Sequence, residues 1–231
     1  MKILALDTST EACSAAIYQD GIVEQRFELA PREHTKLILP MIDELLANAE
    51  LKISQLDALA FGCGPGSFTG VRIATGIAQG LAFGADLPVV PVSTLASVAQ
   101  AVYEEHQHQH VLAAIDARMG EVYWSQYQLG EDGIMVLTGE ELVIKPEQVS
   151  AIAGINWVGA GTAWDVYAEQ LNQAIPQAVS NLYADVLPQS SMMAKIAASV
   201  FQKGQAVSAQ QALPVYLRND VAKKAKDQSA N

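Results

Sequence analysis

The sequence is poor in cysteine and in basic residues. Its 2 cysteines are too few for a disulfide framework, and Cys13 and Cys63 stand in apolar surroundings, which favours reduced, packed thiols in a cytosolic protein. The 14 basic against 25 acidic side chains give a net charge of −11. A chain of that sign repels polyanions, so we do not expect it to bind nucleic acid by itself.

Long hydrophobic runs are also missing. Asp7 ends the N-terminal apolar run too early for a signal sequence, and no other window approaches the length of a membrane-spanning helix. The absence of such runs excludes a membrane role, and we expect a cytoplasmic location. Because 50% of the residues are hydrophobic, the chain is long and apolar enough for one sizeable core or for two related halves.

The hydrophobic pattern indicates two halves that begin alike. In each half an apolar strand ends in Asp, and a later Asp-Gly pair between apolar runs predicts a hairpin. The elements predicted for the first half are strands 2–7, 13–19 and 22–29, helix 35–49, strand 56–61, helix 69–83, strand 88–92 and helix 94–105. Those predicted for the second half are strands 111–116, 121–129 and 134–137, a short helix at Pro146, strand 156–158 and helices 164–174 and 191–203.

A polar, aperiodic segment, residues 104–110, marks the linker between the halves. We therefore expect an N-terminal subdomain over residues 1–105 and a C-terminal subdomain over 111–218. A flexible tail follows over 219–231. Its Lys223, Lys224 and Lys226 are most simply a solvated end.

Four motifs closely resemble the bacterial tRNA threonylcarbamoyladenosine biosynthesis family TsaB, also called YeaZ. They are ILALDTST (3–10), GPGSFTGVRI (64–73), DARMGEVY (116–123) and PVYLRN (214–219). The resemblance spans nearly the whole chain and implies an α/β fold of the actin-like (ASKHA, ribonuclease H-like) superfamily. That fold duplicates a βββαβα unit, here with a mixed five-stranded sheet in the first half and a shorter, degenerate second half.

The glycine-rich run Gly62–Gly76 lies between a predicted strand and a predicted helix, a junction that suits an anion. It lacks the lysine of a P-loop and the spacing of a dinucleotide fingerprint. The superfamily resemblance implies phosphate contacts in the first hairpin turn, and the strand–loop–helix junction would allow them in this run. The alternatives are a close backbone passage and simple turn capping. The candidate phosphate or nucleotide contacts are Asp7, Thr8, Ser9, Gly64, Gly66 and Ser67.

Other elements of a catalytic site are incomplete. The turn Asp116–Gly120 carries bulky residues where the superfamily has a second phosphate loop. The transferase of the same pathway, TsaD, has two metal-binding histidines one helical turn apart, whereas this chain has His34 and Ile38, so we expect no metal site and a surface or interface role for His34. His106, His108 and His110 are interpreted as solvated. No activated nucleophile is evident.

Two helices are more apolar than a single core face requires. Leu37 and Met41 widen the stripe of the first, and Gly76, Gly80 and Gly84 repeat at four-residue spacing in the second. Packing on the chain's own sheet explains part of this pattern. The family resemblance implies that the same helices contact TsaD, or a second copy in a homodimer. The candidate interface residues are His34, Leu37, Ile38, Met41, Leu45, Arg72, Ile73, Gly76, Ile77 and Gly80.

The hypothesis that combines these features is a non-catalytic scaffold subunit. It would bind the catalytic subunit TsaD, and with it the ATPase TsaE, for threonylcarbamoyl transfer to tRNA, which this chain would contact only indirectly. No cofactor is expected, and ATP or ADP would touch this chain only within the complex. The alternatives are a small ATP-dependent kinase or ATPase that uses Asp7 to Ser9 and, with less support, a peptidase.

Overall fold

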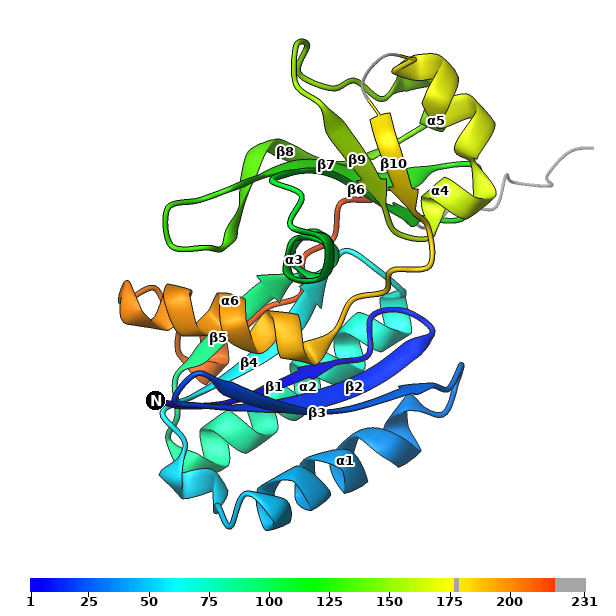
Figure 1. Ribbon diagram of the computed structural model, residues 1–231. Helices are drawn as coiled ribbons and strands as arrows, with labels where there is room; N and C mark the ends of the chain where they lie inside the picture. The colour runs from blue at the N-terminus through cyan, green and yellow to red at the C-terminus, as the bar shows by residue number, and fades with distance from the viewer. Residues whose placement is uncertain (177–178, 219–231) are drawn as a thin grey trace, which may run out of the picture.

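The computed structural model describes residues 1–176 and 179–218, which form two five-stranded mixed sheets. Each sheet opens with an antiparallel meander and is completed by strands parallel to its first strand (Figure 1). The predicted α/β duplication is therefore confirmed. In the described part of the chain, no helix has the length and hydrophobicity needed to cross a membrane.

The first sheet has the order β3-β2-β1-β4-β5. Asp20 and Gly21 both have positive φ at the hairpin between β2 and β3, as the Asp-Gly pair predicts. The elements are β1 (Lys2–Asp7), β2 (Ala12–Gln19), β3 (Ile22–Leu29), α1 (His34–Asn48), η1 (Ile53–Gln55), β4 (Ala58–Gly64), α2 (Phe68–Ala85), β5 (Val89–Ser93) and α3 (Thr94–His106).

The second sheet has the order β10-β9-β6-β7-β8. Its elements are β6 (His110–Asp116), β7 (Val122–Leu129), β8 (Met135–Ile144), η2 (Pro146–Gln148), β9 (Trp157–Ala160), α4 (Ala163–Val166), α5 (Ala168–Ala174), β10 (Val179–Tyr183), α6 (Ser190–Gln202) and η3 (Ala209–Gln211). Strand β10 was not predicted, because its mostly exposed residues show no apolar alternation. Strand β8 is longer than predicted, since polar residues follow Leu137.

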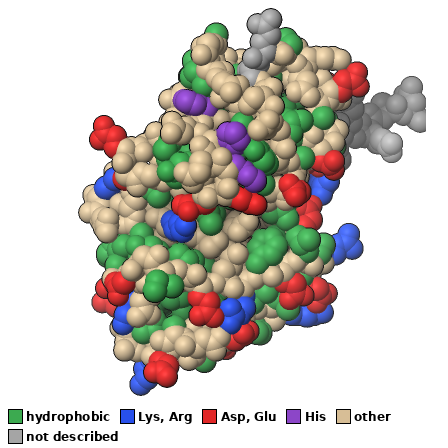
Figure 2. Space-filling model, in the orientation of Figure 1, with side chains coloured by type: hydrophobic (Ala, Val, Ile, Leu, Met, Phe, Trp, Pro, Cys, Tyr) green, Lys and Arg blue, Asp and Glu red, His purple; other side chains and the backbone are tan. Residues whose placement is uncertain are grey.

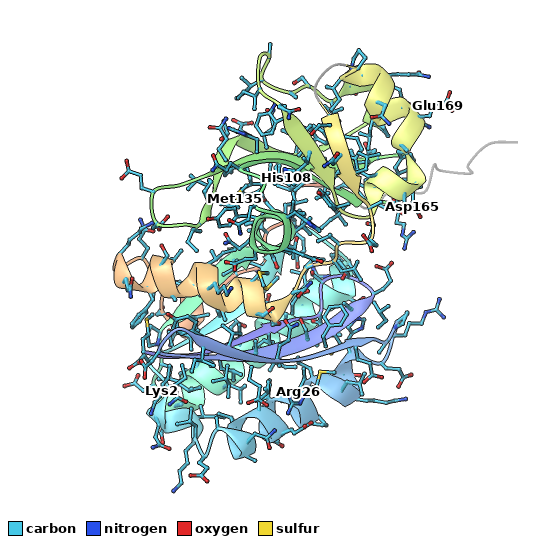
Figure 3. All side chains as sticks on the ribbon, viewed as in Figure 1. Lys2, Arg26, His108, Met135, Asp165 and Glu169 are labelled. Carbon is cyan, nitrogen blue, oxygen red and sulfur yellow. The ribbon has the colours of Figure 1, made fainter. Side chains whose placement is uncertain are left out.

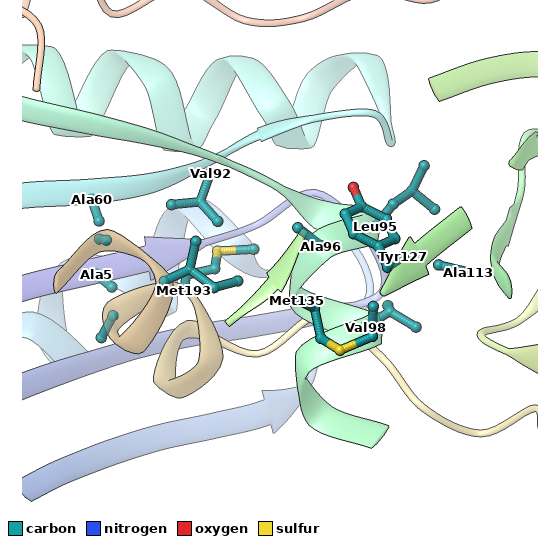
Figure 4. Close-up of a cluster of buried hydrophobic side chains, with 14 of the residues drawn as sticks. Ala5, Ala60, Val92, Leu95, Ala96, Val98, Ala113, Tyr127, Met135 and Met193 are labelled. Carbon is teal, nitrogen blue, oxygen red and sulfur yellow. The ribbon is translucent and has the colours of Figure 1, made fainter. Parts of the chain in front are cut away.

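Helices α3 and α6 lie between the two sheets, whereas α1 and α2 cover the opposite face of the first sheet (Figure 1). The largest hydrophobic cluster therefore joins both halves: Ala5 and Val92 of the first sheet, Val98 of α3, Tyr127 of the second sheet and Met193 of α6 belong to it (Figure 4). Helix α6 follows the second half in sequence but packs on β1 and β2 of the first.

The three histidines near the predicted linker are not simply solvated. The ring of His106 stacks on Tyr183, with centroids 4.1 Å apart, and the Nε2 atom of His108 lies 2.8 Å from the Tyr183 hydroxyl. His110 meets the ring of Trp157 edge-on. His106 is exposed as predicted, whereas His108 and His110 are half-buried. The solvated interpretation was wrong for these two because their aromatic partners, Tyr183 of the unforeseen β10 and Trp157 of β9, could not be assigned from the sequence. Histidines gather on the face seen in Figure 2.

Candidate functional site

A cleft of about 1240 Å³ opens between the two halves. The first half contributes the β1–β2 turn, the β3–α1 turn and the start of α2, and the second half contributes the β6–β7 turn and α4, which carries Asp165 (Figure 3). The last described residues complete the wall. We call residues 207–218 the C-terminal strap.

Asp7 does not reach this cleft. Its side chain is completely buried, Oδ2 accepts hydrogen bonds from the Ser9 hydroxyl (2.9 Å) and amide (3.3 Å), and Oδ1 has no partner among the described residues. Burial raises the pKa of the Asp7 carboxyl to about 6, although the hydrogen bonds from Ser9 oppose the shift. Thr8 is equally buried, and its hydroxyl donates to the Gly70 carbonyl (2.6 Å).

The glycines of the run let two turns pack against each other. A Cβ atom on Gly66 would lie 2.5 Å from the Ser9 carbonyl oxygen, and one on Gly70 would overlap the Thr8 carbonyl. A Cβ on Gly64 would lie 2.8 Å from the Val215 carbonyl oxygen in the strap. Of the candidate phosphate contacts, only Ser9, Gly66 and Ser67 line the cleft. The close backbone passage considered for this run is therefore present in the structure.

Ion pairs engage the arginines that line the cleft on the side of the second half and of the strap. Arg118 pairs with Asp116 (2.7 Å) in its own turn and with Glu11 (2.9 Å) across the cleft, and Arg218 of the strap pairs with Glu121. Arg118 and Met119 have φ values of 61° and 59°, a conformation that favours glycine. These two arginines are thus already neutralised by carboxylates of the chain itself.

The candidate interface residues on α1 lie mainly inside the molecule. His34 is not a surface residue, because it is 9% exposed and its Nε2–H donates to the Thr10 carbonyl (2.9 Å). Ile38, Met41 and Leu45 are buried against the first sheet. Their spacing is that of a core-facing stripe, so they hold α1 in place, and of the α1 candidates only the half-buried Leu37 reaches the surface.

The candidates on α2 have the opposite character. Arg72, Gly76 and Gly80 are exposed, and Ile73 and Ile77 are half-buried. A Cβ atom on Gly76, Gly80 or Gly84 would meet nothing within 4 Å. We call the surface formed by Arg72, Ile73, Gly76, Ile77 and Gly80 the open face of α2. Its glycines have no packing role in the described part of the chain.

Sequence reasoning did not predict that aromatic rings surround Arg72, at one end of this face. The Arg72 guanidinium carbon lies 3.2 Å from the ring centroid of Phe68 and 5.2 Å from that of Tyr216 in the strap. The Phe68 ring falls at four-residue spacing from Arg72, which is a usable signal. Nothing in the sequence brings Tyr216 to α2.

Neither cysteine is an activated nucleophile. Burial raises the pKa of the Cys13 thiol to about 11 and that of the Cys63 thiol to about 12, so both are protonated near neutral pH. Within residues 1–176 and 179–218, no three His, Cys, Asp or Glu side chains are placed to hold a metal ion.

Comparisons with known proteins agree with the motifs. A family model described as TsaD, tRNA N6-adenosine threonylcarbamoyltransferase, matches residues 3–226. The tRNA threonylcarbamoyladenosine biosynthesis protein TsaB of Escherichia coli K12 is 47% identical over 96% of this chain and 96% of its own length. That of Haemophilus influenzae is 47% identical over 96% of this chain and 95% of its own length.

A solved structure, YeaZ from Pseudomonas aeruginosa, is similar in both sequence and fold. It has 48% identity and a TM-score of 0.89, and the match covers 94% of this chain and 99% of that one. The transferase model and this structure together confirm the actin-like fold class. The chain belongs to the TsaB family of tRNA threonylcarbamoyladenosine biosynthesis proteins.

Proposed function

We propose that this chain is a non-catalytic subunit of the machinery that forms N6-threonylcarbamoyladenosine in tRNA, and that it acts by binding the transferase TsaD. The observation that carries the proposal is a contrast between two regions. Asp7 and Thr8, which a nucleotide-using relative would present to phosphate, are buried, whereas the open face of α2 has exposed glycines whose added Cβ atoms would meet none of the described residues.

The non-catalytic part of the proposal is supported by three features. Asp7 and Thr8 are completely buried, and the Thr8 hydroxyl is engaged by Gly70, so neither presents a ligand for metal-bound phosphate in the cleft. His34 is bonded to a backbone carbonyl, and Ile38 stands one helical turn later. We propose that the free chain holds no cofactor and that ATP or ADP contacts it only within the complex.

The partner assignment is supported by the shape of α2 and by the shared fold. A family model of the transferase matches residues 3–226, so the transferase offers helices equivalent to α1 and α2. Glycines at four-residue spacing let a second helix approach closely, and Ile73 and Ile77 add apolar surface beside them. The half-buried Leu37 of α1 is the remaining interface candidate. The same face would pair two copies of the chain when TsaD is absent.

In this proposal TsaE joins through TsaD, and tRNA is contacted indirectly, since the net charge of −11 opposes binding of a polyanion. The subunit would act in the cytoplasm, where the tRNA substrate is found.

The test is calorimetric titration of the purified chain with TsaD, with and without ATP. We expect association of the wild type and at least about tenfold weaker binding for Ile77→Glu, because a carboxylate would be desolvated between apolar side chains. Leu142→Glu, on the exposed β8 edge of the second half, is a matched control that should bind normally. Failure of the wild type to bind would refute the proposed function. Normal binding of Ile77→Glu would refute only the interface.

A second measurement separates the scaffold from the kinase or ATPase alternative. The free chain should show no ATP turnover, and the mass of the chain alone, measured by light scattering, should report a homodimer that TsaD dissociates. Turnover that Asp7→Asn abolishes would instead favour the enzyme.

A further inference from the structure

The open face of α2 carries charge at one end only. Arg72 is the one charged residue in the helix, and Phe68, Arg72, Gly76, Gly80 and Gly84 follow each other at four-residue spacing on its exposed side. Beyond Arg72 the exposed side of the helix is uncharged to its C-terminal end. A partner lying along this side would meet a single cation of α2 itself, at the N-terminal end of the helix, and Lys52 of the preceding segment beside Gly80 and Gly84.

The guanidinium of Arg72 is held by two aromatic rings. Its carbon is 3.2 Å from the Phe68 centroid and 5.2 Å from the Tyr216 centroid. Among the described residues Arg72 forms no ion pair and no side-chain hydrogen bond. The two ring centroids are 5.8 Å apart, so the rings flank the guanidinium at an angle and do not sandwich it. Since no N–H group of Arg72 is used in a hydrogen bond among the described residues, these groups remain available as donors.

Tyr216 is placed by the C-terminal strap. The Val215 amide donates to the Cys63 carbonyl (2.7 Å), the Gln79 side chain donates to the Ala212 carbonyl (2.7 Å), and Ala212 is completely buried. The strap is therefore bonded to both β4 and α2 just before it supplies the ring. The stack restricts Arg72 before any partner arrives, which reduces the entropy lost on binding.

We propose that the Phe68–Arg72–Tyr216 stack is the charged anchor of the open face and binds an Asp or Glu carboxylate at one end of an otherwise apolar partner helix. This inference rests on the proposed function. A guanidinium binds a carboxylate through two parallel N–H···O bonds, which fixes position as well as adding affinity. A carboxylate at Arg72 would set the register in which the partner helix lies over the glycines.

A carboxylate fits the surroundings of Arg72 better than a phosphate chain does. Binding of a nucleic acid backbone needs several cations, whereas α2 has no charged residue other than Arg72. Of the arginines that line the cleft with Phe68 and Tyr216, Arg118 and Arg218 are already paired with carboxylates of this chain, which leaves Arg32.

The experiment compares TsaD binding by wild type, Arg72→Gln, Arg72→Lys and Tyr216→Ala at low and high salt. We expect Arg72→Gln to weaken binding by roughly 10- to 100-fold, the range for a charged hydrogen-bonded pair, and to reduce its salt dependence. Arg72→Lys should also weaken binding, because an ammonium group lacks the planar fork. Tyr216→Ala should have a smaller effect of the same sign.

Lys203→Gln is the matched control, since Lys203 also carries an exposed charge but pairs with Asp132 beside α6, on the other face of the first sheet. It should bind TsaD as the wild type does, and thermal unfolding should show that all variants fold. Binding of Arg72→Gln within about twofold of wild type, while Ile77→Glu binds poorly, would overturn the anchor and leave the interface standing. A loss seen only with ATP present would overturn it in favour of a phosphate. If wild type does not bind TsaD, the proposed function and the anchor both fall.

Discussion

The buried carboxyl of Asp7 should lower the stability of the folded chain at neutral pH. The pKa of this group rises from 3.8 to about 6 on folding, chiefly because burial disfavours its charged form. Between these two values the folded state keeps a proton that the unfolded state releases, so the free energy of unfolding falls as the pH rises. Above pH 6 the free energy of unfolding has fallen by the full equivalent of this pKa difference, about 3 kcal/mol.

Asp7→Asn removes the charge and keeps nearly the same shape, with an acceptor for the hydrogen bonds from Ser9. We expect this variant to be more stable by up to about 3 kcal/mol at pH 7, or roughly 6–12 °C in melting temperature for a chain of this length. The gain should nearly vanish by pH 4, where the wild-type carboxyl is protonated in the folded state.

Urea unfolding of the free chain, followed by tryptophan fluorescence at a series of pH values, measures this gain. Asp43→Asn, on the exposed side of α1, is the control and should change stability by less than about 0.5 kcal/mol at every pH. A gain for Asp7→Asn that did not depend on pH would show that the charge is not its cause. No gain at pH 7 would show that the buried carboxylate is stabilised by something other than Ser9.

Three further outcomes test the packing. Gly70→Ala should destabilise the chain by at least about 3 kcal/mol, since its Cβ would overlap the Thr8 backbone. Gly76→Ala should instead stabilise the free chain by about 1 kcal/mol, because its Cβ meets no other atom. Equal stabilities of the two variants in urea unfolding would contradict this reasoning. Leu45→Ala should cost about 2–5 kcal/mol in the same assay, and a value near zero would place Leu45 outside the core. Cys63 should resist iodoacetamide in the native chain at pH 8, because its thiol is buried with a pKa of about 12, and it should react after unfolding. Mass spectrometry measures the labelling, and rapid labelling of the native chain would contradict the burial.

Much of the fold can be predicted from local sequence patterns, namely turn dipeptides and hydrophobic alternation. Asp20-Gly21 and the alternation on either side of it predict the first hairpin, and the recurrence of this pattern predicts the duplication. Boundaries were less predictable. Strand β4 runs on to Gly64, beyond the apolar segment, because its last residues are paired with β5.

Features that depend on distant segments could not be predicted. Strand β10 has few buried residues, and its place at the edge of the second sheet depends on pairing with β9. The stripe of Ile38 and Leu45 predicts an apolar helix face, but not whether the chain's own sheet or a partner covers it. The burial of Asp7 could not be predicted either, since its carboxyl occupies the space that a Cβ atom on Gly62 of β4 would fill.

The glycines of this chain fall into two groups, those that its own packing requires and those that its own packing does not explain. Those of the loop, such as Gly66 and Gly70, touch backbone atoms of the first turn, so this chain's own packing excludes any larger residue there. Gly76, Gly80 and Gly84 have open space above them, and each lowers helix stability by about 1 kcal/mol relative to alanine. Within the described residues no contact of an added Cβ explains these glycines, and in the proposed function the compensation comes from a helix of another chain. Gly76→Ala should therefore stabilise the free chain and weaken its complex with TsaD, and equal or tighter binding would refute the partner role of this face.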